Sequence, residues 1–109
     1  MESWRQELED EFALAHAARA RGNEGQARVC ARRAAGIAIR EYLARRGQPQ
    51  RKPSAYDLLI ILKSDPETPP ELQPLLDHLT LRVTEEFKLP VQADLVADAR
   101  ALSKALLGE

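Results

Sequence analysis

Residues 27–47 constrain the fold of this chain more than any other segment, and they read ARVCARRAAGIAIREYLARRG. At 100° per residue of a helix, small apolar residues share one arc and larger apolar residues form a second arc. A helix that is apolar on two sides has neighbours on both, and small side chains let one neighbour approach closely. We therefore predict a central helix with a helix-packing or dimer ridge made of Ala27, Ala31, Ala34, Ala35 and Ala38.

Start and stop signals predict four further helices and no competing strand. The expected helices cover about 4–21 and 24–46, a brief segment between residues 54 and 66, then about 69–84 and 94–107, with a loop at 85–92. Their signals are capping patterns that begin at Ser3, Asn23, Ser54 and Thr68, and stop residues at Gly22, Gly47 and Gly108. The predicted fold is all-α, an up-and-down four-helix bundle with one additional short helix, and residues 1–109 form a single domain.

Several classes of protein are excluded by composition. The sequence has no apolar run of the roughly 18 residues that a membrane span needs, and acidic and basic residues follow Met1 at once. We expect a soluble cytoplasmic protein with no membrane partner. Cys30 is the only cysteine, so the chain has no internal disulfide and no cysteine cluster. No cofactor and no metal are predicted, since Asp94 and Asp98 lack a third ligand.

Charge is strongly segregated beneath a net charge of −1. Residues 1–18 carry −4, residues 19–52 carry +8 and residues 53–109 carry −5. Such a pattern favours either an anionic partner for the middle segment or internal pairing of the middle with the two ends. The candidate ligand- or anion-binding residues lie on the polar arc and at the end of the central helix, and they are Arg33, Arg40, Arg45 and Arg46.

Arg32 is expected to have a different role from these four arginines. It falls between Val29 and Ile39 on an otherwise apolar arc, where a buried guanidinium needs a partner. Asp94 and Asp98 are four residues apart and point the same way on their helix. We therefore predict a structural ion pair between Arg32 and one of these carboxylates.

Residue patterns for catalysis are sparse. His16 lies at the edge of the apolar stripe that begins with Trp4, and Cys30 is interpreted as a small buried residue. The Gly-Asn-Glu-Gly turn at residues 22–25 lacks the preceding strand and the lysine of a phosphate loop. Tyr42 and Tyr56 are too few to form a base-stacking platform, so the basic segment supports only sequence-nonspecific contact with phosphates. No catalytic residue is assigned.

Three segments together resemble the HEPN superfamily of small helical bundles. They are the alanine-spaced helix, the run L-L-x-H-L-x-x-R-V at residues 75–83, and LPVQADLVADARAL at residues 89–102, which looks like the proline-containing loop and last helix of that family. The resemblance covers nearly the whole chain. It implies a HEPN-like bundle that commonly dimerises, is often paired with a minimal nucleotidyltransferase, and is tied to nucleotide or RNA biology, including toxin-antitoxin systems.

Nuclease members of the family carry an Arg followed, after four to six residues, by a His, and this chain has no such spacing. Glu71, Leu72 and Gln73 precede His78 at those positions, and residues 9–11 before His16 are acidic. We therefore predict a non-catalytic, homodimeric HEPN-like module that binds a nucleotide, RNA or a minimal nucleotidyltransferase. The alternatives are an interaction or scaffold protein with no nucleic-acid role and, less favoured because the motif is missing, a ribonuclease that would depend on His78.

Overall fold

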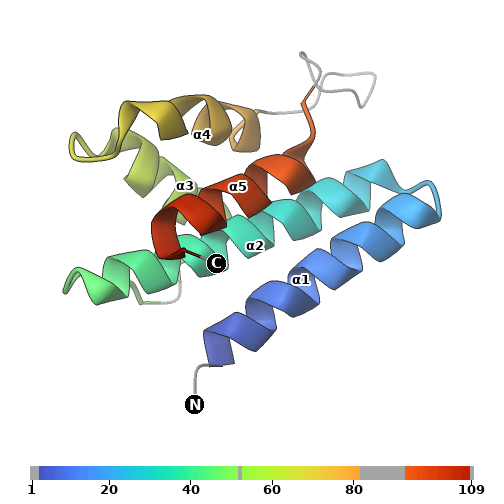
Figure 1. Ribbon diagram of the computed structural model, residues 1–109, viewed down its shortest axis with the longest axis horizontal. Helices are drawn as coiled ribbons and strands as arrows, with labels where there is room; N and C mark the ends of the chain where they lie inside the picture. The colour runs from blue at the N-terminus through green and yellow to red at the C-terminus, as the bar shows by residue number, and fades with distance from the viewer. Residues whose placement is uncertain (1–2, 52, 82–92, 109) are drawn as a thin grey trace.

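The structure of the protein is a computed structural model, which describes residues 3–51, 53–81 and 93–108 (Figure 1). These residues are helical apart from their connections, which confirms the all-α prediction, and no strand occurs among them. The helices are α1 (Ser3–Ala20), α2 (Glu24–Arg45), α3 (Ala55–Ser64), the 3-10 turn η1 (Pro70–Leu72), α4 (Gln73–Leu79) and α5 (Leu95–Leu107).

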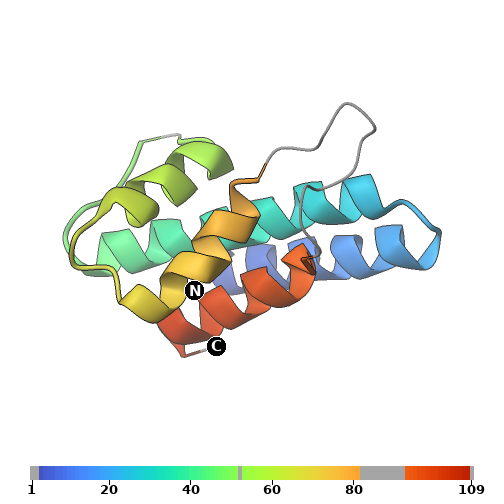
Figure 2. The same cartoon turned by 90° about the horizontal axis from the view of Figure 1, so that it is seen from above.

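The central position belongs to α2. The α1 and α2 helices form an antiparallel hairpin, and α5 packs along α2 and runs in the same direction as α2 (Figure 1). The α5 helix also reaches α1, where its Arg100 pairs with Glu9 at 2.7 Å. The α3 helix packs on α2 as well, and α4 crosses between α3 and α5 when the molecule is viewed from above (Figure 2). The radius of gyration is 13.4 Å, near the value of about 13 Å for a globular domain of about 100 residues.

Local sequence signals explain most helix boundaries. The Asn23 side chain accepts a hydrogen bond from the backbone N–H of Gln26 at 3.0 Å, and Ser54 caps α3 through the N–H of Asp57 at the same distance. The helix α5 ends at Gly108, where φ is 77°, a left-handed conformation that glycine adopts without steric cost. The predicted caps at these three positions are confirmed.

The helix expected at 69–84 is shorter than predicted. It consists of η1 and the seven-residue α4, and it ends at Leu79, before the part of the prediction that lies outside the described residues. Thr68 does not cap it, since Pro69 holds the cap position of η1 and no side chain bonds there. The Thr68 hydroxyl donates to the carbonyl of Leu62 at 2.7 Å. Residues 85–92, the predicted loop, also lie outside the described ranges.

The alanine ridge is completely buried inside the single chain. Its five members, Ala27, Ala31, Ala34, Ala35 and Ala38, each have 0% exposure, so they pack helices together and offer no surface to a second copy. On the second arc Ile39 and Leu43 are buried as well, but Val29, which was predicted to belong to the same apolar arc, is 40% exposed. None of the described helices is long and apolar enough to cross a membrane.

Candidate functional site between α1, α2 and α3

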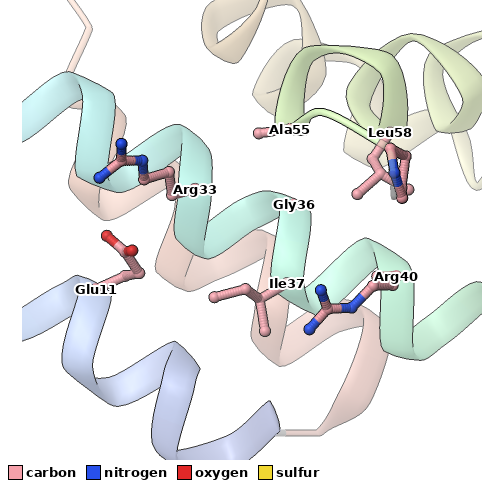
Figure 3. Close-up of a pocket in the computed structure, with 8 residues that line it drawn as sticks. Glu11, Arg33, Gly36, Ile37, Arg40, Ala55 and Leu58 are labelled. Carbon is pink, nitrogen blue, oxygen red and sulfur yellow. The ribbon is translucent and has the colours of Figure 1, made fainter. Parts of the chain in front are cut away.

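A pocket of about 200 Å³ opens where α1, α2 and the start of α3 meet (Figure 3). Its apolar part includes Ile37 of α2 and Leu58 of α3, and charged side chains stand around it. The full lining consists of Glu11, Arg33, Gly36, Ile37, Arg40, Pro53, Ala55 and Leu58. Two of the four predicted anion-binding arginines, Arg33 and Arg40, therefore lie at one pocket.

Close contact between α2 and α3 forms one wall of this pocket. Gly36 faces Ala55, and a Cβ placed on Gly36 would lie 3.0 Å from the Ala55 Cβ and 3.1 Å from the Ala55 Cα. Real Cβ atoms are rarely this close to a neighbour, so the absence of a side chain at residue 36 lets the first turn of α3 lie against α2. Ser54, which caps α3, thus starts this helix next to the pocket.

One end of the pocket carries two groups with unused hydrogen-bonding capacity. Glu11 of α1 and Arg33 of α2 extend toward the same region in Figure 3. The Oε2 atom of Glu11 is buried and has no hydrogen-bond partner among the described residues. Arg33 is exposed, and within the described ranges it makes no hydrogen bond or ion pair. A bound molecule that supplies both a donor and an acceptor would satisfy both side chains.

The other end of the pocket carries Arg40, which is already paired. Its Nη2 lies 3.1 Å from Glu7 Oε2, and the two side chains are 43% and 51% exposed. A surface pair of this kind contributes about 0–1 kcal/mol, so Arg40 can exchange Glu7 for another anion at small cost.

Arg45 and Arg46 are not brought to the pocket. Arg45 pairs with Glu41 at 3.5 Å and lies over the ring of Trp4. Arg46 donates to the Tyr42 hydroxyl at 2.9 Å and pairs with Glu67 and, at 3.7 Å, with Asp65. Arg45 thus pairs within α2, and Arg46 connects the end of α2 to the acidic residues that follow α3.

The predicted ion pair of Arg32 with Asp94 or Asp98 is wrong. Arg32 Nε donates to the carbonyl of Leu79 at 2.9 Å, and its Nη2 donates to the carbonyl of Leu81 at 2.8 Å. Because α4 ends at Leu79, the carbonyls of Leu79 and of Leu81, just beyond the helix, have no partner within α4, and the guanidinium supplies one to each. Desolvation, followed by repulsion from Arg28, lowers the pKa of Arg32 from its ordinary value.

Asp94 has two other partners. It caps α5 by accepting from the N–H groups of Val96 and Ala97 at 3.1 Å, and it pairs with Arg19 at 3.0 Å. Burial works to raise the pKa of Asp94, but the hydrogen bonds from Arg19 and from these backbone groups outweigh it and hold the pKa below its ordinary value.

Asp98 pairs with a histidine of α4. Its Oδ2 lies 3.0 Å from His78 Nδ1, and this contact joins α4 to α5. Desolvation raises the pKa of Asp98 against the opposing effect of His78. His78, the residue on which ribonuclease activity would depend, is thereby placed in a contact between helices.

Sequence reasoning missed Glu11 and the role of Gly36. In the sequence Glu11 is one of several acidic residues of the first helix, and only the packing of α1 against α2 reveals its buried oxygen. A glycine among alanines in the middle of a helix was a signal for close approach, because glycine costs about 1 kcal/mol relative to alanine there. Within the described ranges no group of three or more His, Cys, Asp or Glu side chains is placed to hold a metal ion.

Comparison with known protein families, curated proteins and solved structures finds no match to this chain.

Proposed function

We propose that this chain is a non-catalytic nucleotide-binding module, built as a HEPN-like helical bundle, whose ligand occupies the pocket between α1, α2 and α3. The observation that carries the proposal is the placement of Arg33 and Glu11, two charged groups with unused hydrogen-bonding capacity, at one end of a pocket that has Arg40 at its other end. A nucleotide presents both donors and acceptors on its base and negative charge on its phosphate.

A single nucleotide is favoured over a long RNA as the ligand. Long RNA binding draws on many cationic side chains along a surface. Here Arg19, Arg40, Arg45, Arg46 and Arg100 each pair with a carboxylate of the same chain. Internal pairing thus occupies these cations. Four described arginines have neither a hydrogen bond nor an ion pair within the described ranges, Arg21, Arg28, Arg33 and Arg51, and of these Arg33 is the one that lines the pocket between α1, α2 and α3.

The proposal is tested by isothermal titration calorimetry with 5′-GMP and 5′-AMP. We expect binding by the parent chain and at least tenfold weaker binding by the double variant Arg33→Gln, Arg40→Gln. The matched control is Arg45→Gln, Arg46→Gln, which removes the same charge away from the pocket and should bind as the parent does once circular dichroism shows that it is folded. Absence of nucleotide binding, or equal loss in both double variants, would overturn the proposal.

A second candidate function, self-association as a scaffold, is favoured by the outer face of α3. Tyr56, Ile60 and Ile61 are 43%, 37% and 37% exposed and line a hollow of about 520 Å³. Arg51 and Asp57 also line it, so the face carries one charge of each sign around an apolar centre. Such a face complements a copy of itself in a two-fold dimer, in which each cation meets the partner's anion.

Sedimentation equilibrium tests this second candidate. The parent should form a dimer at high micromolar concentration, and Ile60→Glu should be monomeric because it places charge in the apolar centre. Leu14→Glu, at a residue of α1 that is 54% exposed, is the control and should dimerise as the parent does. A monomeric parent would remove this candidate and leave the nucleotide proposal unaffected.

A further inference from the structure

We infer that the base recognised by the pocket is guanine, held between Glu11 and Arg33 with the phosphate on Arg40, an inference that rests on the proposed nucleotide-binding function. It goes beyond that function by assigning a role to each charged residue of the pocket. The assignment follows from the acceptor of Glu11 and the donors of Arg33, which have no hydrogen-bond partner among the described residues.

Glu11 supplies the acceptor for the base. Its Oε2 is buried without a partner, whereas buried carboxylate oxygens ordinarily accept hydrogen bonds. Glu11 lines the pocket, and a change of rotamer at the inner bonds of its side chain would turn both carboxylate oxygens toward it, whereas rotation about the last bond alone only exchanges the buried oxygen for the other. An ionised carboxylate accepts only, and its two oxygens match two parallel N–H donors.

Arg33 supplies the complementary donors. It extends over the same end of the pocket as Glu11 in Figure 3, and its guanidinium presents a planar set of N–H groups. A base that hydrogen-bonds to both residues needs acceptors for Arg33 and, on an adjoining edge, donors for Glu11. Guanine has them, because N7 and O6 accept on one edge while N1–H and the 2-amino group donate on the adjoining edge. Adenine instead presents its N1 lone pair where the carboxylate of Glu11 would lie.

Arg40 is placed to receive the phosphate. It lies seven residues after Arg33 on α2, about 10.5 Å further along the helix axis, a separation suited to a base at one end and a phosphate at the other. Glu7, its present partner, is 51% exposed and can turn into solvent. The carboxylate of Glu11, with its buried oxygen, stays near Arg33 and repels a phosphate from that end.

The size of the pocket agrees with a base between Glu11 and Arg33 and a phosphate at Arg40. A volume of about 200 Å³ is below the roughly 300–1,000 Å³ of pockets that enclose a drug-sized ligand, so the pocket encloses a ring system and holds the phosphate only at its rim, beside the half-exposed Arg40. Ile37 lies between the two ends in Figure 3, where it can contact the flat face of a base.

Calorimetric titration with 5′-GMP, 5′-IMP, 5′-AMP and guanosine tests the assignment. We expect 5′-GMP to bind about 10- to 100-fold more tightly than 5′-AMP, the range for a bidentate contact to a base, and 5′-IMP, which lacks the 2-amino group, to fall between them. Glu11→Gln should bring 5′-GMP and 5′-AMP to within threefold of each other. Arg40→Gln should remove the advantage of 5′-GMP over guanosine and leave the base preference intact.

Stability measurements separate recognition from a structural role of Glu11. Glu11→Gln replaces a buried unpaired carboxylate oxygen, so the unliganded variant should melt at the same temperature as the parent or higher. A lower melting temperature together with unchanged base preference would assign Glu11 to the fold and overturn the inference.

Failure of this inference is distinguishable from failure of the proposed function. Equal affinity for 5′-GMP and 5′-AMP, still weakened in the variant Arg33→Gln, Arg40→Gln, would overturn the guanine assignment and keep nucleotide binding at the pocket. No binding of any of the four compounds would overturn both.

Discussion

At the scale of single residues, Arg32 shows how a buried cation can be held without a carboxylate. Its guanidinium donates to two backbone carbonyls at the end of α4, at 2.9 and 2.8 Å. We expect Arg32→Ala to lower the free energy of unfolding by about 1–3 kcal/mol, because carbonyls that lose a charged donor pay the cost of an unsatisfied buried group. Urea denaturation measures the change.

The neighbouring arginine is the matched control for this prediction. Arg33 is exposed and pairs with no described residue, so Arg33→Ala should change the free energy of unfolding by no more than about 0.5 kcal/mol. Equal effects of the two alanine substitutions would contradict the role assigned to Arg32.

Asp98 gives a prediction for pH. Its folded-state pKa is raised above the ordinary value of 3.8, with desolvation as the largest cause. Between the ordinary and the raised pKa, the folded state holds the proton more often than the unfolded state, so this group makes stability fall as pH rises through that interval. Above that interval the ionised Asp98 carboxylate lowers the free energy of unfolding, and Asp98→Asn should remove this loss of stability.

The measurement is the urea midpoint of the parent and of Asp98→Asn at pH values from 3 to 6. The stability of the variant relative to the parent should increase with pH. Asp57→Asn, at an exposed residue of the first turn of α3, serves as the control for the loss of one negative charge. A constant difference between parent and Asp98→Asn across this range would refute the prediction.

At the scale of elements, Arg19 connects three helices at one point. It bonds to Glu24 at the start of α2, at 2.7 Å, and to Asp94 at the start of α5, at 3.0 Å. Negative charge near these helix N-termini also complements their dipoles. Asp94 thus combines an ion pair with the cap of α5.

Two substitutions at residue 94 separate these contributions. Asp94→Asn keeps an acceptor for the N–H groups of α5 and should cost less than about 1 kcal/mol, the value of an exposed ion pair. Asp94→Ala also removes the cap and should cost a further 0.5–2 kcal/mol, or about 1 kcal/mol typically. Thermal unfolding compares the two variants, and an alanine variant as stable as the asparagine variant would show that the cap contributes nothing.

At the scale of the whole molecule, the approach of α3 to α2 at Gly36 determines how α3 and the pocket are placed. Gly36→Ala should lower the free energy of unfolding by about 1–3 kcal/mol, because the new methyl group would lie 3.0 Å from the Ala55 Cβ and the helices must move apart. Chemical denaturation measures the loss.

Gly25→Ala is the control for this prediction. Gly25 also lies in α2, but a Cβ there would meet only the Asn23 side-chain oxygen at 3.8 Å. This substitution should leave stability unchanged or raise it by up to about 1 kcal/mol, because alanine is the better helix former. A Gly36→Ala variant as stable as Gly25→Ala would contradict the close-packing argument.

The sequence by itself determined the helices that carry strong local signals. Apolar periodicity and the caps Asn23 and Ser54 are properties of a few neighbouring residues, so they predicted α1, α2, α3 and the central place of α2. The same signals failed for Thr68, whose hydroxyl bonds to Leu62 rather than to the next helix. A capping pattern shows that a side chain can hydrogen-bond to the next helix, but tertiary packing decides which backbone group that side chain actually contacts.

Only the tertiary structure decided the partners of charged residues and the position of the site. Arg32 contacts carbonyls because α4 ends beside it. Arg46 contacts Glu67 because α3 starts against the middle of α2 and runs toward the end of α2 where Arg46 lies. The pairing of Arg40 with Glu7, and the pocket that joins Glu11 to Arg33, depend on the packing of α1 against α2. Local propensity acts over one or two helical turns, whereas these contacts join residues more than 20 positions apart, so their geometry is set by how whole helices pack.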